Sequence, residues 1–307
     1  MLSILCAALL PWLFWDQGPA TADAVKQAGI ERLYVPADQA SEWKSAGIAA
    51  QPFVMAQFTR IPVLGIAHQV DTAGATSAPW VIGNGWRFER DRNGKYYYNV
   101  PWHKATLAAA EAYAYGVEAV VRADARDLAA FGRMLVFLRG IDRPAVPVRA
   151  NIGIMDDGSA QTGEVLNLLA RRNLLFQVVR EPDPKYDLNV QIGTKEYPKS
   201  AATNPAAFAV LVRQKLGDEK RLLRVYGTDV VIGRLTGDER NARLHLINYG
   251  GSKVEGMRVR IRGDYAHGSV AVFGTGNATL TDYSVANGAT EFTIPEMDVY
   301  AVIDLQK

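Results

Sequence analysis

The chain has 307 residues, of which 49% are hydrophobic and 21% are charged, and its formal net charge is +2. This composition is typical of a globular protein long enough for two or three domains, and it excludes a disordered or fibrous chain. The small net charge, without Lys/Arg runs interleaved with aromatics, argues against a nucleic-acid partner. The single cysteine, Cys6, excludes an intramolecular disulfide and argues against thiol catalysis.

The apolar N-terminus has two interpretations. In the first, residues 2–15 are the hydrophobic region of an export signal and Ala20-Thr21-Ala22 is its cleavage site. Asp16 ends the apolar run before the ~20 residues that a membrane span needs, so no span is expected.

In the second interpretation the same stretch belongs to the folded domain. A strand over residues 10–15, a turn at Gly18-Pro19, and a helix over residues 22–28 with Thr21 as N-cap form one coherent unit. We favour a signal confined to about the first eight residues, with the strand retained. This interpretation predicts a secreted or periplasmic protein; without a signal, the protein is cytoplasmic.

Strands and helices alternate over a first region, residues 9–145, which is typical of a parallel sheet covered by helices. Further strands are expected at residues 33–35, 51–56, 63–71 and 117–124, and helices at residues 38–46, 102–115 and 125–140. Residues 85–100 predict a β-hairpin, because apolar alternation flanks the turn sequence Asp91-Arg92-Asn93-Gly94. Too few strands are present for a complete eight-stranded barrel, so an open or truncated barrel is expected.

Two further regions follow a proline-containing linker at residues 142–150. Residues 150–227 alternate strand and helix and predict a small doubly wound α/β domain, with its last strand over residues 221–227. Residues 228–307 contain short strands separated by Gly, Asn and Asp turns, which predicts an antiparallel β-sandwich. Arg258, Arg260 and Arg262 alternate along one of these strands; a solvated face is favoured there over an anionic-ligand site.

The order of these regions resembles multidomain glycoside hydrolases of the β-galactosidase type. The resemblance lies in "IGIMDDGSAQTGEVLNLLARRNLLFQVV", "YDLNVQIG", "RLHLINYGGSKVEGMRVRIRG" and "TEFTIPEMDVYAVIDL". It implies a truncated TIM-like α/β domain, an amidotransferase-like α/β domain and a C-terminal antiparallel β-sandwich. It further implies that any catalytic acid and nucleophile are carboxylates at the carboxyl ends of barrel strands.

Three aspartates follow predicted strands of the first region and are the candidate catalytic residues: Asp16, Asp71 and Asp124. Glycoside hydrolysis needs one carboxyl group that protonates the leaving oxygen and a second that attacks carbon or activates water. The alternative is that each aspartate caps the following helix or fixes a loop, and for Asp124 capping is the favoured interpretation.

Polar and aromatic neighbours of these aspartates are the candidate saccharide-binding residues, because indole rings stack on sugar faces and amides bond hydroxyls. They are Trp15, Gln17, His68, Gln69, Trp80, Asn84, Trp86 and Arg87. For Trp80 and Trp86 the favoured alternative is that they anchor a loop to the core.

No cofactor or metal ion is expected, because the four histidines are scattered and form no ligand motif. Three hypotheses follow: a glycoside hydrolase-like protein acting on a saccharide, a non-catalytic saccharide-binding or assembly protein, and a nucleotide-binding protein. The third is weakest, because the loop at residues 155–163 lacks a phosphate-binding motif. The sequence leaves the oligomeric state open, with a homo-oligomer among the alternatives.

Overall fold

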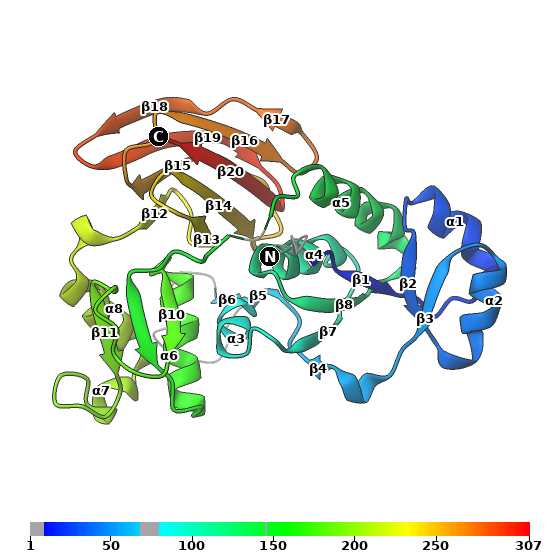
Figure 1. Ribbon diagram of the computed structural model, residues 1–307, viewed down its shortest axis with the longest axis horizontal. Coiled ribbons are helices and arrows are strands. Elements are labelled where there is room, and N and C mark those ends of the chain that lie inside the picture. The colour runs from blue at the N-terminus through cyan, green and yellow to red at the C-terminus, as the bar shows by residue number, and fades with distance from the viewer. Residues whose placement is uncertain (1–8, 68–79, 145) are drawn as a thin grey trace, which may run out of the picture. The chain divides into compact units, whose positions relative to one another are not determined.

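The computed structural model describes residues 9–67, 80–144 and 146–307 (Figure 1). The chain divides into two compact units: the first combines Met1–Gly65 with Asp91–Ala145, and the second combines Ile66–Arg90 with Val146–Lys307. Among the described residues, no helix is both long and apolar enough to cross a membrane.

The first unit contains a six-stranded sheet in which every pairing is parallel. In the order β3-β2-β1-β8-β7-β4, its strands are Ala49–Pro52, Arg32–Val35, Trp12–Phe14, Glu118–Arg122, Lys95–Asn99 and Thr59–Arg60. The helices of this unit are α1 (Ala22–Gln27), α2 (Ala40–Ser45), α4 (Ala105–Tyr115) and α5 (Leu128–Gly140). Short 3-10 turns lie at Pro19–Thr21, Ala37–Gln39, Met55–Gln57 and Ala125–Asp127.

Aromatic side chains fill one face of this sheet. Phe14 of β1 and Tyr97 of β7 both contact Phe53, which follows β3, at ring-centroid distances of 4.6 and 5.0 Å. Phe53 also stacks on Phe58, which precedes β4. Phe53 and Phe58 lie on the connection between β3 and β4, which are the two edges of the strand order, so this connection packs aromatic rings against β1 and β7.

The segment at residues 85–100 differs from the expected hairpin, and that prediction is wrong. Gly85–Arg90 is helix α3, and Lys95–Asn99 is β7, which pairs in parallel with β8 and β4. Alternation of apolar and polar residues over only six positions does not distinguish a strand from a helix of about one and a half turns. Tertiary contacts decided it: Trp86 is buried in the core of the second unit, and Arg90, one helical turn later, stacks on its ring.

The second unit contains a small parallel sheet with the strand order β10-β9-β11, made of Phe176–Val179, Ile152–Met155 and Leu188–Gln191. Its helices are α3, α6 (Ala160–Arg171), α7 (Lys199–Ala202) and α8 (Pro205–Leu216), with a 3-10 turn at Asp218–Lys220. A two-stranded sheet pairs β5 (Gly65–Ala67) with β6 (Trp80–Ile82).

Two antiparallel sheets form the C-terminal part of the second unit. One has the order β12-β15-β19-β18, with bounds Leu223–Tyr226, Val254–Arg262, Ala289–Met297 and Thr281–Ala286. The other has the order β13-β14-β20-β16-β17, with bounds Val231–Gly237, Asn241–Asn248, Tyr300–Gln306, His267–Val272 and Gly276–Ala278. Leu244 and Ile303 of the second sheet share one apolar core with Val259 and Phe292 of the first. β12, expected as the last strand of the middle region, pairs with β15 of this sandwich.

Candidate functional site

The carboxyl ends of β1 and β8 bring two charged side chains together in the first unit. β1 and β8 are parallel neighbours with Phe14 opposite Arg122, so Asp16 and Arg122 leave the sheet at the same edge. Nη2 and Nε of Arg122 donate to Oδ2 of Asp16 at 2.8 and 3.0 Å. The Asp16 side chain is 29% exposed and that of Arg122 is 42% exposed. The pair is thus held in place and open to solvent.

Two amide side chains extend this pair. Nη1 of Arg122 donates to the side-chain oxygen of Asn99, at the end of β7, at 3.3 Å. The amide of Gln17 donates to Oδ1 of Asp16 at 3.0 Å. Asp16, Gln17, Asn99 and Arg122 are referred to below as the carboxyl-edge cluster. It presents a carboxylate, two amides and a guanidinium from three adjacent strand ends, at the edge where parallel sheets bind ligands.

The electrostatics of the cluster keep Asp16 ionised. Partial burial on its own would raise the pKa of Asp16, but the hydrogen bonds from Arg122 and Gln17 and the guanidinium charge outweigh it and lower the pKa. The same contact with Asp16 raises the pKa of Arg122. The carboxylate therefore serves as a hydrogen-bond acceptor at neutral pH.

Asp124 caps the 3-10 turn at Ala125–Asp127, as the favoured interpretation predicted. Its Oδ1 accepts from the backbone N–H of Arg126, and its two oxygens accept from Nε and Nη2 of the Arg126 side chain. These bonds hold the pKa of Asp124 well below its usual range. Its partner lies two residues away, so the contact is local to its own loop.

An exposed indole lies in the loop after β7. Trp102 is 44% exposed, and the guanidinium of Arg126 lies 4.3 Å from its ring centroid. The next residue, His103, has a φ of 69°, an uncommon conformation for a residue other than glycine. The buried carboxylate of Asp127 accepts from the backbone N–H of His103 at 3.1 Å and helps to hold this turn. The imidazole of His103 lies against the indole, with ring centroids 3.5 Å apart, so Arg126 and His103 each cover part of this half-exposed ring.

Trp15 has a structural role. It is 3% exposed, and its indole N–H donates to the hydroxyl of Thr21 at 2.8 Å. That hydroxyl in turn donates to the carbonyl of Gly18. Thr21 precedes α1 as expected, but its side chain makes no capping bond because it is engaged by Trp15.

The candidates in residues 80–87 belong to the second compact unit, where they pack against its core. Trp86 is buried beside α6, close to Gly163, and Trp80 is partly buried against the same core with Arg171 stacked on its ring. Asn84 is fully buried, and the guanidinium of Arg87 stacks on Trp86. These contacts favour loop anchoring, the alternative stated for the two tryptophans. Asp71, His68 and Gln69 lie outside the described residues.

The sequence analysis missed Asn99, Arg122 and Trp102. Asn99 and Arg122 lie at the last positions of β7 and β8, and polar residues at strand ends could have indicated them. Asn99 was hidden inside the wrongly predicted hairpin, and Trp102 was assigned to a helix that begins only at Ala105. Within the described ranges, no group of three or more His, Cys, Asp or Glu side chains could hold a metal ion.

Comparison with known proteins gives a fold and no family. No protein-family model matches the sequence, and no curated protein matches it. The alpha-L-fucosidase isoenzyme 2 from Paenibacillus thiaminolyticus is similar in structure, with a TM-score of 0.52 at 10% identity over 69% of this chain and 60% of that one. A GH42 beta-galactosidase from G. stearothermophilus matches 96% of this chain and 60% of its own, at 11% identity and a TM-score of 0.42. The chain spans about 60% of the length of these structures. Its likeness to the fucosidase, over 69% of this chain, shows a glycosidase-like fold.

Proposed function

We propose that this protein binds saccharides at the carboxyl-edge cluster, with Trp102 as a nearby stacking surface. The observation that carries the proposal is the Asp16–Arg122 pair, which joins two strand ends 106 residues apart and stays open to solvent. A carboxylate, amides and a guanidinium are the groups that fix sugar hydroxyls, and an exposed indole offers an apolar face. The glycosidase-like fold supports a saccharide as the ligand class.

The same geometry favours binding over hydrolysis by Asp16 and Asp124. A glycosidase needs one carboxyl group that is still protonated near neutral pH, which requires a raised pKa. Asp16 and Asp124 each accept hydrogen bonds from an arginine, and both have lowered pKa values. Glycoside hydrolysis with Asp71 as the second carboxyl group is the competing proposal, and the glycosidase-like fold is what favours it.

Titration calorimetry against a panel of neutral oligosaccharides tests the binding proposal. Arg122→Gln removes the guanidinium that fixes Asp16 and Asn99, and we expect at least a tenfold loss of affinity for any saccharide that binds. Arg133→Gln, an exposed arginine of α5, is the matched control and is expected to bind as the unaltered protein does. Equal affinity in both variants would contradict a site at the carboxyl edge.

Product analysis on the same panel separates binding from hydrolysis. We expect no cleavage of the glycosidic bond that depends on Asp16 or Asp124. Asp23→Asn, at an exposed acid of α1, is the control. Cleavage that is abolished in Asp16→Asn and retained in Asp23→Asn would favour the hydrolase. Cleavage lost only in Asp71→Asn would assign the reaction to that residue instead.

We further propose export with any signal confined to about the first eight residues, so that β1 and Asp16 remain in the mature protein. β1 is the central pairing partner of β2 and β8, so its removal would divide the parallel sheet. Mass spectrometry of the mature N-terminus tests this: a chain that starts at Asp23 lacks Asp16 and contradicts the proposed site.

A further inference from the structure

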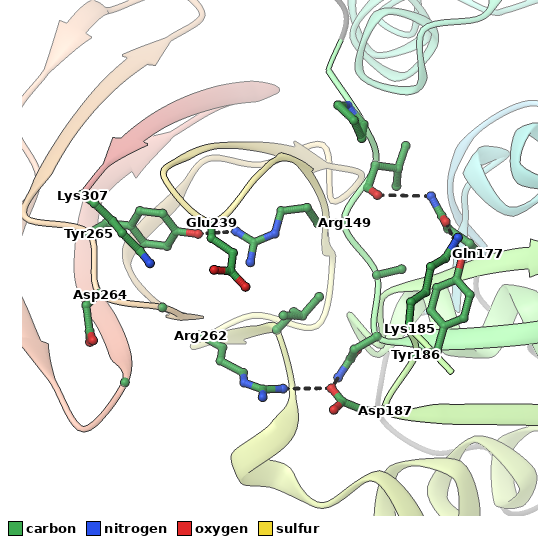
Figure 2. Close-up of a pocket in the computed structure, with 17 residues that line it drawn as sticks. Arg149, Gln177, Lys185, Tyr186, Asp187, Glu239, Arg262, Asp264, Tyr265 and Lys307 are labelled. Carbon is green, nitrogen blue, oxygen red and sulfur yellow. Dashed lines mark hydrogen bonds and ion pairs between the residues drawn. The ribbon is translucent and has the colours of Figure 1, made fainter. Parts of the chain in front are cut away.

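A second polar site lies within the second compact unit and shares no residue with the carboxyl-edge cluster. A cavity of about 710 Å³ lies where the linker at residues 147–151, the loop before β11 and the sandwich meet. This volume is within the usual range for small-molecule sites. Figure 2 shows two arginines that enter it from opposite walls, Arg149 from the linker and Arg262 from the end of β15.

Arg149 is held in place by hydrogen bonds to neutral oxygens. Its Nη1 donates to the hydroxyl of the fully buried Tyr265 and, at 2.9 Å, to the backbone carbonyl of Asp238. Within the described part of the chain, no carboxylate lies within ion-pair distance of its guanidinium. Both of its hydrogen-bond partners are neutral oxygens, and the carboxylate of Asp238 interacts with it electrostatically without forming an ion pair. The guanidinium can therefore form a hydrogen-bonded ion pair with a ligand.

The linker that carries Arg149 is also fixed. The backbone N–H of Arg149 donates to the carbonyl of Leu235 at 2.8 Å, and Val148 forms a bridge with Thr236 of β13. The side chain of Gln177 donates to the carbonyl of Val148, and Tyr186 donates to Gln177 at 2.5 Å. The guanidinium is therefore already ordered before a ligand binds, so binding costs little side-chain conformational entropy.

Arg262 has a different position in the same cavity. Its Nη1 donates to Oδ2 of Asp187 at 2.8 Å, and Asn151 donates to the same oxygen at 3.3 Å. Asp187 is thus neutralised by its own contacts. The arginine alternation along β15 was expected to be a solvated face, and Arg258 does pair with Glu291 there, but Arg262 lines the cavity.

The charges that line the cavity indicate the ligand class. Lys185 is paired with Asp183 and Arg262 with Asp187, so Arg149 and Lys307 are the cationic side chains of the lining that face Glu239 and Asp264. A single carboxylate matches the forked geometry of the Arg149 guanidinium, whereas a doubly charged phosphate is repelled by these two acids. In the described structure Glu239 and Asp264 form no ion pair, and their oxygens can accept hydrogen bonds from ligand hydroxyls.

We propose that this cavity binds a sugar acid, a monosaccharide-sized ligand with one carboxylate on Arg149 and hydroxyls on Glu239 or Asp264. The site is independent of the carboxyl-edge cluster, and either one can exist without the other.

Galacturonate is the probe, and galactose, glutarate and inorganic phosphate are the comparison ligands, each titrated calorimetrically into the full chain. We expect galacturonate to bind at least tenfold more tightly than galactose, which lacks the carboxylate, and than glutarate, which lacks the sugar hydroxyls. Equal affinity for either of them, tighter binding of phosphate, or no binding of galacturonate would overturn the proposal.

Two variants, one of the arginine and one of the acid, test whether the ligand binds in the cavity. Arg149→Gln is expected to weaken galacturonate binding at least tenfold, and Arg180→Gln, an exposed arginine outside the cavity, to leave it unchanged. Glu239→Gln replaces a carboxylate proposed to accept ligand hydroxyls by an amide, and it is expected to weaken binding severalfold. Since Glu239 is exposed, this variant keeps the test decisive if Arg149→Gln fails to fold.

The variant Arg122→Gln of the carboxyl-edge cluster distinguishes the cavity proposal from the proposed saccharide site at the carboxyl edge. Galacturonate binding that is lost in Arg149→Gln and retained in Arg122→Gln belongs to the cavity, whatever happens to neutral saccharides. Galacturonate binding that follows Arg122→Gln and ignores both cavity variants would overturn the proposal.

Discussion

Two aspartate–arginine ion pairs lie at the carboxyl ends of parallel strands. Their N–O distances are equal, but one pair is more exposed to solvent than the other; they are called the open pair and the closed pair below. Asp16 after β1 pairs with Arg122 at 2.8 Å, and Asp156 after β9 pairs with Arg90 at 2.8 Å. The first pair is 29% and 42% exposed, and the second is 10% and 20% exposed. Arg90 also donates to the backbone carbonyl of Ser159, so this pair fastens α3 to the start of α6. Contact distance alone therefore does not indicate a site; solvent exposure distinguishes the pair that we propose to bind a ligand from the structural one.

The largest expected effect on the free energy of unfolding comes from substitution of a closely packed glycine in a helix of each unit. A Cβ on Gly132 of α5 would lie 1.8 Å from the backbone carbonyl oxygen of Ala28, whereas one on Gly163 of α6 would lie 2.9 Å from the ring of Trp86. Since a side chain shifts more easily than backbone, we expect Gly132→Ala to lower the free energy of unfolding by about 3 kcal/mol and Gly163→Ala by about 1 kcal/mol.

Denaturant unfolding measures both glycine variants. Gly140→Ala, at an open position of α5, is the matched control and should be neutral or slightly stabilising. Equal losses for Gly132→Ala and Gly163→Ala would contradict the difference in packing.

The variant Arg90→Gln tests whether the closed pair, Asp156 and Arg90, has a structural role. It leaves the mostly buried carboxylate of Asp156 without its arginine, so we expect a loss of about 2 kcal/mol in unfolding free energy. Because the pair is closed to ligands, saccharide affinity measured by calorimetry should stay within twofold. A large loss of affinity at unchanged stability would break the distinction drawn between the two pairs.

Asp157, next to the closed pair, gives a smaller and pH-dependent effect. Hydrogen bonds from Ser159 and Thr162 lower the pKa of Asp157 to about 2 from an ordinary value of 3.8. A depressed folded-state pKa stabilises the fold above about pH 4, and this contribution is lost as the pH falls toward about 2. Asp157→Asn should therefore cost about 1 kcal/mol at pH 7, allowing for its exposure, and almost nothing at pH 2. Thermal unfolding at both pH values measures it; a cost independent of pH would contradict the assignment.

Arg122→Gln, the variant of the open pair, should have the smallest effect on stability. Exposed ion pairs contribute little, so we expect less than about 0.5 kcal/mol in unfolding free energy. The tenfold loss of saccharide affinity proposed above would then appear at nearly unchanged stability, the reverse of Arg90→Gln. A stability loss as large as that of Arg90→Gln would show that the open pair is structural too.

The sequence alone determined what depends on neighbours within a few residues. Apolar periodicity predicted the parallel alternation of the first region, and the short alternating strands predicted the antiparallel sheets, because burial imposes the period of each element. Asp124 was correctly favoured as a cap, since its partner Arg126 lies two residues away. The hairpin over residues 85–100 failed for the opposite reason: Trp86 and Arg90 are held by distant parts of the second unit.

Only the tertiary structure decided which polar residues meet. Asp16 was a candidate from its position after β1, but its partners Arg122 and Asn99 come from the ends of β8 and β7, and strand order is not written in any local pattern. The cavity around Arg149 and Arg262 likewise joins a linker to a sandwich strand. Side chains far apart in sequence are brought together by the pairing and packing of whole elements, so the chemistry of both sites appears only in the folded chain.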